Sequence, residues 1–266
     1  MEYREKDPQM LTESEIRKYR KSAAHTEVHK TLDSTNNRAK ELAMCGAESG
    51  TLVLADAQTQ GRGRFGRKFH SPEGTGLYMS LLLRPKMPAE QAVRVTILAA
   101  VAAAQAVEAL AGGHAEIKWV NDLYMGGKKV CGILTEAGMD FERGALEYCI
   151  VGLGMNVSAW EYPEEIARIA TSVEEQTGKC VSRNRLAAEI VNRIEEGLGD
   201  IQSPKLTEEY RRRSCVLGRH VTVYRGNDVF DALAEEIADD GALLVRTSDG
   251  AAIALHSGEV SLKIRP

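Results

Sequence analysis

This 266-residue sequence predicts an α+β protein, in which a mixed sheet with packed helices is followed by a small all-β module. Residues 26–214 alternate between strand-like apolar runs and helical stretches, as expected for a sheet covered by helices. The Gly126-Gly127 pair between two short strand-like runs is typical of a two-residue hairpin. Because a hairpin joins antiparallel strands, a purely parallel doubly wound sheet is not expected.

The elements divide the chain into three expected parts: a helical lead over residues 1–25, a main region over 26–214 and a C-terminal β domain over 215–266. In the lead, Thr12 and Glu15 have the spacing of a capping box and predict one short helix. Strands are expected near 26–32, 51–56, 77–84, 116–119, 129–137 and 147–155. Helices are expected near 35–45, 89–111, 163–175, 183–199 and 205–213. In the β domain, turn sequences at 225–228, 239–241 and 248–250 separate short strands.

Composition places the chain among ordinary globular proteins. A net charge of −4 with 43% hydrophobic residues does not fit a generally basic nucleic-acid binder. The five cysteines are widely spaced without a C-x-x-C pair, so they predict neither a disulfide framework nor a zinc site. The charged N-terminus lacks a secretory signal, and the most apolar stretch, Val95 to Val107, is too short to span a membrane. We therefore expect a cytoplasmic protein with reduced thiols and no membrane partner.

The segment Gly61–Phe69 combines four cations with three glycines. Glycine lets backbone N–H groups approach a ligand, and guanidinium groups match the oxygens of phosphates and carboxylates. The segment therefore predicts a site for an oxyanion-rich ligand, with a solvated basic loop or a nucleic-acid patch as the alternative. Its letters also satisfy G-x-G-x-x-G, but Pro72 and Gly74 follow where a dinucleotide fold requires a helix.

Four further segments follow the same order and separations as in one known family: Asp33-Ser34-Thr35-Asn36, Lys118-Trp119-Val120-Asn121-Asp122, Lys129-Val130-Cys131-Gly132-Ile133-Leu134 and Val151-Gly152-Leu153-Gly154-Met155-Asn156. With the basic loop, they resemble biotin protein ligases, whose usual forms are D-S-T-N, G-R-G-R-x-G-R, K-W-P-N-D, K-x-x-G-I-L and G-x-G-x-N. Any one block is common by chance, but the colinear set covers about residues 26 to 157. Val120 replaces the usual proline, which leaves the turn geometry open, and Phe69 stands where tryptophan is frequent, without an indole donor.

The resemblance implies a biotin–[acetyl-CoA-carboxylase] ligase in its short form, without an N-terminal DNA-binding domain. It implies a catalytic domain over 26–214 that is similar to class II synthetases, and an SH3-like barrel over 215–266. Such enzymes form biotinyl-5′-AMP from biotin and ATP with Mg²⁺, and then transfer biotin to a lysine of a biotin carboxyl carrier protein or carrier domain. No protein nucleophile is needed for either step.

Fixed positive charge is the expected catalytic device, because two anions must meet and more charge develops at the α-phosphate. Lys129 is the best candidate to bridge the biotin carboxylate and the α-phosphate, helped by Arg62 and Arg64. Asp122 either binds Mg²⁺ or orients Lys129 through an ion pair. Without its motif, Lys129 would be an ordinary surface lysine.

The binding residues follow from the same motifs. Those implied for biotin are Ser34, Thr35, Asn36, Gln58, Arg62, Gly63, Arg64, Lys129 and Gly132. Those implied for ATP or the adenylate are Arg64, Arg67, Phe69, Asn121, Lys129 and Asn156. Hydroxyls and amides at 34–36 suit the ureido group, although Ser34 also fits a helix N-cap. Gly132 either makes room for the ligand or is a close-packed strand glycine, and Phe69 either covers the adenine or belongs to the core.

Two other functions compete with this interpretation. Lipoate protein ligases share the general fold and adenylate chemistry, but as a family they lack the arginine-glycine loop. A biotin-responsive DNA-binding repressor needs an N-terminal winged helix of roughly 60 residues, whereas only about 25 precede the catalytic region. We therefore expect no sequence-specific DNA binding. A homodimer is compatible with the family, but no pattern assigns an interface.

Overall fold

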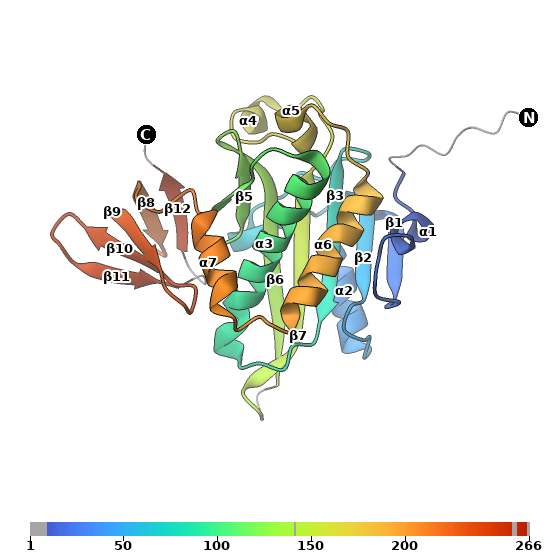
Figure 1. Ribbon diagram of the computed structural model, residues 1–266, viewed down its shortest axis with the longest axis horizontal. Helices are drawn as coiled ribbons and strands as arrows, with labels where there is room; N and C mark the ends of the chain where they lie inside the picture. Colours follow the sequence, from blue (N-terminus) through green and yellow to red (C-terminus); the bar gives the residue numbers. More distant parts are fainter. Residues whose placement is uncertain (1–9, 141, 257–259, 265–266) are drawn as a thin grey trace, which may run out of the picture.

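The computed structural model describes residues 10–140, 142–256 and 260–264, which form two sheets with helices packed on the larger one (Figure 1). The larger sheet has seven strands in the order β1-β2-β3-β7-β6-β5-β4. β1 and β2 are parallel, and the other neighbouring pairs in this sheet are antiparallel. The predicted mixed sheet is therefore confirmed.

The elements lie close to the predicted ranges. The strands of the larger sheet are β1 (Thr26–Leu32), β2 (Leu52–Gln58), β3 (Gly76–Leu83), β4 (Glu116–Lys118), β5 (Asp122–Met125), β6 (Lys128–Asp140) and β7 (Ala145–Asn156). The helices are α1 (Glu13–Arg17), α2 (Thr35–Met44), α3 (Ala92–Ala111), α4 (Glu164–Ala167), α5 (Val173–Thr177), α6 (Arg183–Leu198) and α7 (Pro204–Arg212), with 3₁₀ turns at Arg64–Gly66 and Ala89–Gln91. In the predicted tight hairpin between β5 and β6, Gly126 and Gly127 both have positive φ, at 56° and 75°.

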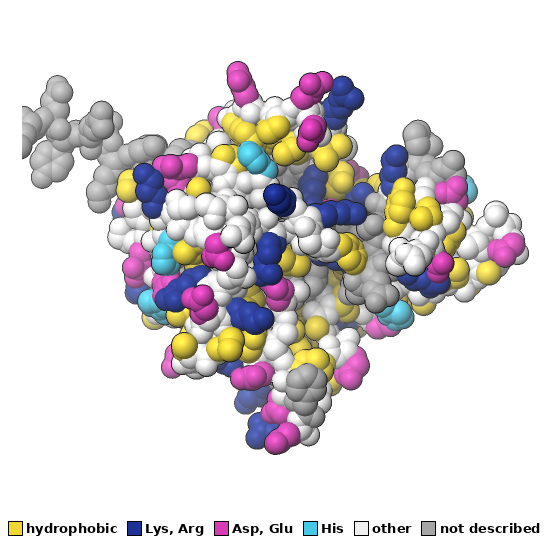
Figure 2. Space-filling model, turned by 180° about the vertical axis from the view of Figure 1, so that it is seen from behind, with side chains coloured by type: hydrophobic (Ala, Val, Ile, Leu, Met, Phe, Trp, Pro, Cys, Tyr) yellow, Lys and Arg dark blue, Asp and Glu magenta, His cyan; other side chains and the backbone are white. Residues whose placement is uncertain are grey.

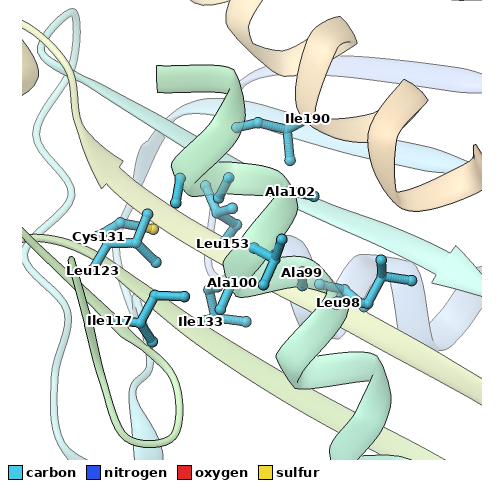
Figure 3. Close-up of a cluster of buried hydrophobic side chains, with 14 of the residues drawn as sticks. Leu98, Ala99, Ala100, Ala102, Ile117, Leu123, Cys131, Ile133, Leu153 and Ile190 are labelled. Carbon is cyan, nitrogen blue, oxygen red and sulfur yellow. The ribbon is translucent and has the colours of Figure 1, made fainter. Parts of the chain in front are cut away.

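Helix α3 forms the centre of the core, against one face of the larger sheet (Figure 3). Its alanines let the helix approach the sheet closely, and Ala100 lies beside Ile133, with Leu153 and Ile117 nearby. The apolar region is longer than the predicted Val95–Val107 stretch. Residues 89–111 have the length and composition of a membrane span, but 67% of the most apolar window is buried inside the protein. Burial against the sheet and α6 accounts for this composition (Figure 1).

One predicted helix is wrong. Instead of a single helix near 163–175, the structure has the short helices α4 and α5, with a turn and a β-bridge at Ala170 between them. Ser172 caps α5 through a reciprocal capping box with Glu175, so a new helix begins at Val173. Residues 169–171 pair instead with the first residues of β6: Lys129 N–H donates to the Ile169 carbonyl, and Thr171 N–H donates to the Lys129 carbonyl, both at 2.9 Å.

The C-terminal part is an all-β module, as predicted, and its antiparallel sheet has the strand order β11-β10-β9-β8-β12. They are β8 (His220–Arg225), β9 (Asp228–Ile237), β10 (Leu243–Thr247), β11 (Ala252–Leu255) and β12 (Val260–Ile264), an arrangement consistent with an SH3-like module. The loop before β10 reaches the main sheet, where the Trp119 indole donates to the Gly241 carbonyl at 3.0 Å. The division of the chain at residue 215 stays a prediction.

Arg213, at the end of α7, is a buried anchor between helices and is only 4% exposed. Its guanidinium lies 2.7 Å from carboxylate oxygens of Glu108 and Glu209. Hydrogen bonds from Arg213 lower the pKa of Glu108 from 4.5 to about 2. We expect Arg213→Ala to lower the free energy of unfolding at neutral pH by about 3 kcal/mol, because it removes the buried guanidinium partner of two partly buried carboxylates.

Urea unfolding at several pH values checks this prediction. The folded-state pKa of Glu108 is depressed, so its contribution is present above the ordinary pKa and is lost as pH falls from 4.5 toward 2. The difference between wild type and Arg213→Ala should therefore narrow in acid. Arg212→Ala removes the neighbouring cation, which is 60% exposed, and should change stability by less than about 1 kcal/mol. Equal losses of unfolding free energy in the two variants would contradict the role of Arg213 as a buried anchor.

Candidate active site

A cavity of about 360 Å³ lies between the loop after β2, the start of β6, the end of β7 and the segment before α5. Figure 2 shows the face of the molecule opposite α3 and α6, where Lys and Arg side chains gather around a hollow. The cavity is lined by every residue predicted for the site: Ser34, Thr35, Asn36, Gln58, Arg62, Gly63, Arg64, Arg67, Phe69, Asn121, Asp122, Lys129, Gly132 and Asn156. The fold thus brings the five motifs together.

The basic loop is closed on itself by backbone hydrogen bonds. Phe69 N–H donates to the Gly61 carbonyl at 2.8 Å, and Gly63 N–H donates to the Arg67 carbonyl at 2.7 Å. A Cβ at position 61 would lie 2.4 Å from the Phe69 carbonyl oxygen, so this closure requires glycine. The loop contains the 3₁₀ turn at Arg64–Gly66 and leads to β3, with no Rossmann-type helix between them.

Lys129 forms an ion pair in the cavity with Asp122 from β5, with 2.7 Å between Nζ and Oδ1. The structure therefore shows the second of the two roles expected for Asp122. The backbone of Lys129 is held by residues 169–171, so this cation is fixed through both its main chain and its side chain.

Arg64 reaches the same corner of the cavity from the loop. Its Nη1 donates to Asn121 Oδ1 at 3.1 Å, and Asn121 Nδ2 donates in turn to the Ile133 carbonyl at 2.7 Å. Burial lowers the pKa of Arg64, and the nearby Asp122 carboxylate opposes this effect. Since arginine keeps its proton under such shifts, the described residues place two cations, Lys129 and Arg64, near the Asp122 carboxylate in this corner.

A second corner holds polar groups near the start of α2. Gln58 Oε1 accepts from the Thr35 N–H at 2.9 Å, and Asn36 Oδ1 accepts from the Ser80 hydroxyl at 2.6 Å. Ser34 is the N-cap residue of α2, but its side chain makes no capping hydrogen bond, so the expected cap is wrong in that respect. Ser80 was not predicted for the site, although a serine in the otherwise apolar strand β3 was an available signal.

The floor of the cavity consists of glycines on β6 and β7. A Cβ at Gly154 would lie 2.6 Å from the Phe69 ring, and one at Gly132 would lie 3.0 Å from Lys129 Nζ. Phe69 also packs edge-on against Tyr78. Gly132 and Gly154 are therefore close-packed strand glycines, which was one of the two alternatives, and they make room for the side chains of Lys129 and Phe69. The Phe69 ring lies across the floor of the cavity.

The mouth of the cavity has aromatic residues that the sequence reasoning missed. His70 stacks on Trp160 with 5.1 Å between ring centroids, and Trp160 lies 4.6 Å from Tyr162. Trp160 and Tyr162 follow Asn156 in the sequence, and Asn156 Nδ2 donates to the Thr171 carbonyl at 3.0 Å. The pair of aromatics two residues apart after the G-x-G-x-N motif was the signal for this group.

The Trp119–Val120 peptide bond, at the departure from K-W-P-N-D, is cis. Tyr210 from α7 donates its hydroxyl proton to the Val120 carbonyl at 2.9 Å. The turn that carries Asn121 and Asp122 is thus held by α7 on one side and by Trp119 and Gly241 on the other.

The described residues contain no group of three or more His, Cys, Asp or Glu side chains placed to hold a metal. Asp122 offers one carboxylate, which is paired with Lys129. A Mg²⁺ ion here would need phosphate oxygens and water for most of its ligands, as is usual for Mg²⁺ in nucleotide sites.

A mixed sheet, an attached antiparallel module and a pocket lined by cations and glycines together define a ligase of the biotin and lipoate class. The model of the "Biotin/lipoate A/B protein ligase family" matches residues 28–156, and that of the "Biotin protein ligase C terminal domain" matches 216–263. With both parts matched, the chain belongs to the biotin protein ligase family.

Relatives and solved structures agree with this assignment. The chain is 39% identical to the bifunctional ligase/repressor BirA of Bacillus subtilis, over 92% of this chain and 77% of that protein. It is 29% identical to the biotin–[acetyl-CoA-carboxylase] ligase of Mycobacterium tuberculosis, over 85% of each chain. The biotin protein ligase of Aquifex aeolicus in complex with biotin and ATP superposes with a TM-score of 0.77 at 32% identity, covering 91% of this chain and 99% of that one.

Proposed function

We propose that this chain is an ATP-dependent biotin–[acetyl-CoA-carboxylase] ligase, which makes biotinyl-5′-AMP and transfers biotin to a lysine of a carboxylase carrier domain. Its family membership and the Aquifex aeolicus complex with biotin and ATP support this function. The observation that carries the proposal is the ion pair of Lys129 and Asp122 inside a cavity that also contains Arg64.

In the first step, a carboxylate oxygen of biotin attacks the α-phosphorus of ATP. A C–O–P linkage forms, the bond from the α-phosphorus to the bridging oxygen breaks, and pyrophosphate leaves. Lys129 and Arg64 lie where they can draw the two anions together and stabilise the charge that grows on the α-phosphate. Asp122 keeps the Lys129 ammonium directed into the cavity.

In the second step, the neutral amine of a carrier lysine attacks the acyl carbon of the adenylate. The C–N bond forms, the acyl C–O bond breaks, AMP leaves, and the amine releases a proton. Before transfer, the adenylate must be shielded from water. The basic loop and the aromatic group both line the cavity and would supply this shielding.

The polar corner and the floor suit the remaining parts of biotin. We assign the ureido ring to Thr35, Gln58 and their neighbours, because these groups both donate and accept hydrogen bonds. Phe69, above Gly132 and Gly154, supplies an apolar surface for the bicyclic ring or the adenine. We further propose that Mg²⁺ enters with the phosphates of ATP, where Asp122 would give it one ligand and the ion would neutralise phosphate charge.

ATP–pyrophosphate exchange tests the function. We expect exchange with biotin, and none with lipoate or octanoate offered in its place, because the arginine-glycine loop distinguishes biotin ligases from lipoate ligases. Labelled pyrophosphate incorporated into ATP is the measured quantity. Exchange supported by lipoate alone would overturn the assignment. Possible homodimer formation and the lack of operator and membrane binding stay predictions.

A further inference from the structure

Glu136, in the middle of β6, binds the basic loop from behind the cavity. Its carboxylate oxygens lie 3.0 and 3.3 Å from Arg62 Nη2, and its Oε2 also accepts from Asn36 Nδ2 at 2.6 Å. Arg62 donates to Asn37 Oδ1 as well, at 2.8 Å. One carboxylate therefore joins three segments that are far apart in the sequence.

This carboxylate is anchored in the interior. Asn36 is only 5% exposed, and its Oδ1 accepts from Ser80, which is fully buried in β3. A Cβ at Gly152 would lie 2.0 Å from Asn36 Oδ1, so the amide packs directly on β7. Glu136 thus connects a rigid part of the sheet with a loop that is otherwise closed mainly on itself.

The basic loop links the position of Arg62 to that of Phe69 on the floor of the cavity. Arg62 forms a β-bridge with Lys68, and Phe69 N–H donates to the Gly61 carbonyl at 2.8 Å. Phe69 follows Lys68 and lies against Gly132 and Gly154. A shift of Arg62 therefore moves the ring that covers the floor.

Glu136 itself is not among the residues that line the cavity. Because it lies outside this lining and contacts Arg62 there, Glu136 can orient the loop without touching the ligand. We propose that Glu136 is a positioning residue for adenylate formation: it holds Arg62, and through Arg62 the loop and Phe69, in the geometry that receives biotin. This inference rests on the proposed biotin ligase function.

The test compares Glu136→Gln with Glu235→Gln. Glu235 makes a similar two-point ion pair with Arg246 on the C-terminal sheet, and its exposure of 33% equals that of Glu136. In Glu136→Gln we expect the KM for biotin in pyrophosphate exchange to rise roughly threefold to tenfold, with kcat changed less than about twofold. Glu235→Gln should leave both constants unchanged. An unchanged KM in Glu136→Gln would overturn the proposal.

A double-mutant cycle with Arg62→Gln separates positioning from direct contact. If Glu136 acts through Arg62, the double variant should have about the same KM as the more affected single variant. Fully additive losses would mean that the two side chains act independently, against the proposal.

Trypsin cleavage of the ligand-free protein gives a readout that does not require activity. Release of the loop in Glu136→Gln should speed cleavage within residues 62–68 severalfold relative to Glu235→Gln. Equal cleavage rates would contradict the positioning role. A wild-type protein without biotin-dependent exchange would refute the proposed function alone, because the cleavage comparison would still decide the role of Glu136.

Discussion

Lys129→Ala is expected to slow biotin-dependent ATP–pyrophosphate exchange by roughly 10²- to 10³-fold, the usual cost of removing a preorganised group that stabilises transition-state charge. Lys129 Nζ lies 2.7 Å from Asp122 Oδ1, so the substitution also leaves a carboxylate facing the incoming phosphate. The loss should therefore appear mainly in kcat of exchange. Transfer from supplied biotinyl-adenylate to a carrier lysine should be less affected, because the α-phosphate charge is then already in place.

Lys128→Ala is the matched control for this prediction. Lys128 is the adjacent cation, and its Nζ donates to the Ala167 carbonyl at 2.9 Å, away from Asp122. We expect its exchange rate to stay within about threefold of wild type. A large loss in Lys128→Ala with little change in Lys129→Ala would show that the catalytic cation has been assigned to the wrong one of two neighbours.

Arg64→Ala should act on the intermediate more than on its formation. Arg64 is held beside the cavity by Asn121, and loss of a charge-assisted hydrogen bond costs about 1.5–3 kcal/mol, or roughly tenfold to a hundredfold in affinity. We expect the variant still to make biotinyl-adenylate but to release it faster by that factor. Stopped-flow dissociation of the preformed adenylate, measured beside pyrophosphate exchange, separates the two effects.

Arg143→Ala serves as the control for Arg64→Ala. Arg143 is 83% exposed in the turn between β6 and β7, where it pairs with the nearby Asp140. It should leave both exchange and adenylate release unchanged. If Arg64→Ala abolished exchange while Lys129→Ala preserved it, the roles proposed for the two cations would be reversed.

Local sequence determined most of the architecture that could be predicted here. The buried strands β3 and β7 and the alanine-rich helix α3 have strong periodicity or composition, and they lie within a few residues of their predicted ranges. The region of α4 and α5 was mispredicted, because its weak helical pattern outweighed the capping signal of Ser172 and Glu175. In the folded protein, pairing of residues 169–171 with β6 decides the conformation.

The motif residues predicted for the site line one cavity, and the pairing of Lys129 with Asp122 was among the expected alternatives, but the other pairings were not predicted. That Lys129, Asp122 and Arg64 share a corner follows from motif order, whereas the contact of Arg62 with Glu136 spans 74 residues of sequence. Such a contact depends on the register of β6 and on the closed form of the loop, and local sequence patterns predict neither of them. For the same reason, the contacts of Ser80 with Asn36 and of Trp160 with His70 are evident only in the folded chain, although the residue types were visible in the sequence.

The contact between Trp119 and Gly241 limits how the C-terminal module can be exchanged in evolution or by engineering. Gly241 has a φ of +89°, and a Cβ there would lie 2.8 Å from Ile97 Cδ1 on α3. Its carbonyl accepts the indole proton from the tryptophan that precedes Val120, Asn121 and Asp122. A module grafted from a relative must therefore bring a glycine and the same loop path to this point. Chimeras that do not preserve the contact between Trp119 and Gly241 would disturb the corner of the cavity that contains Asn121 and Asp122, even with every motif residue intact.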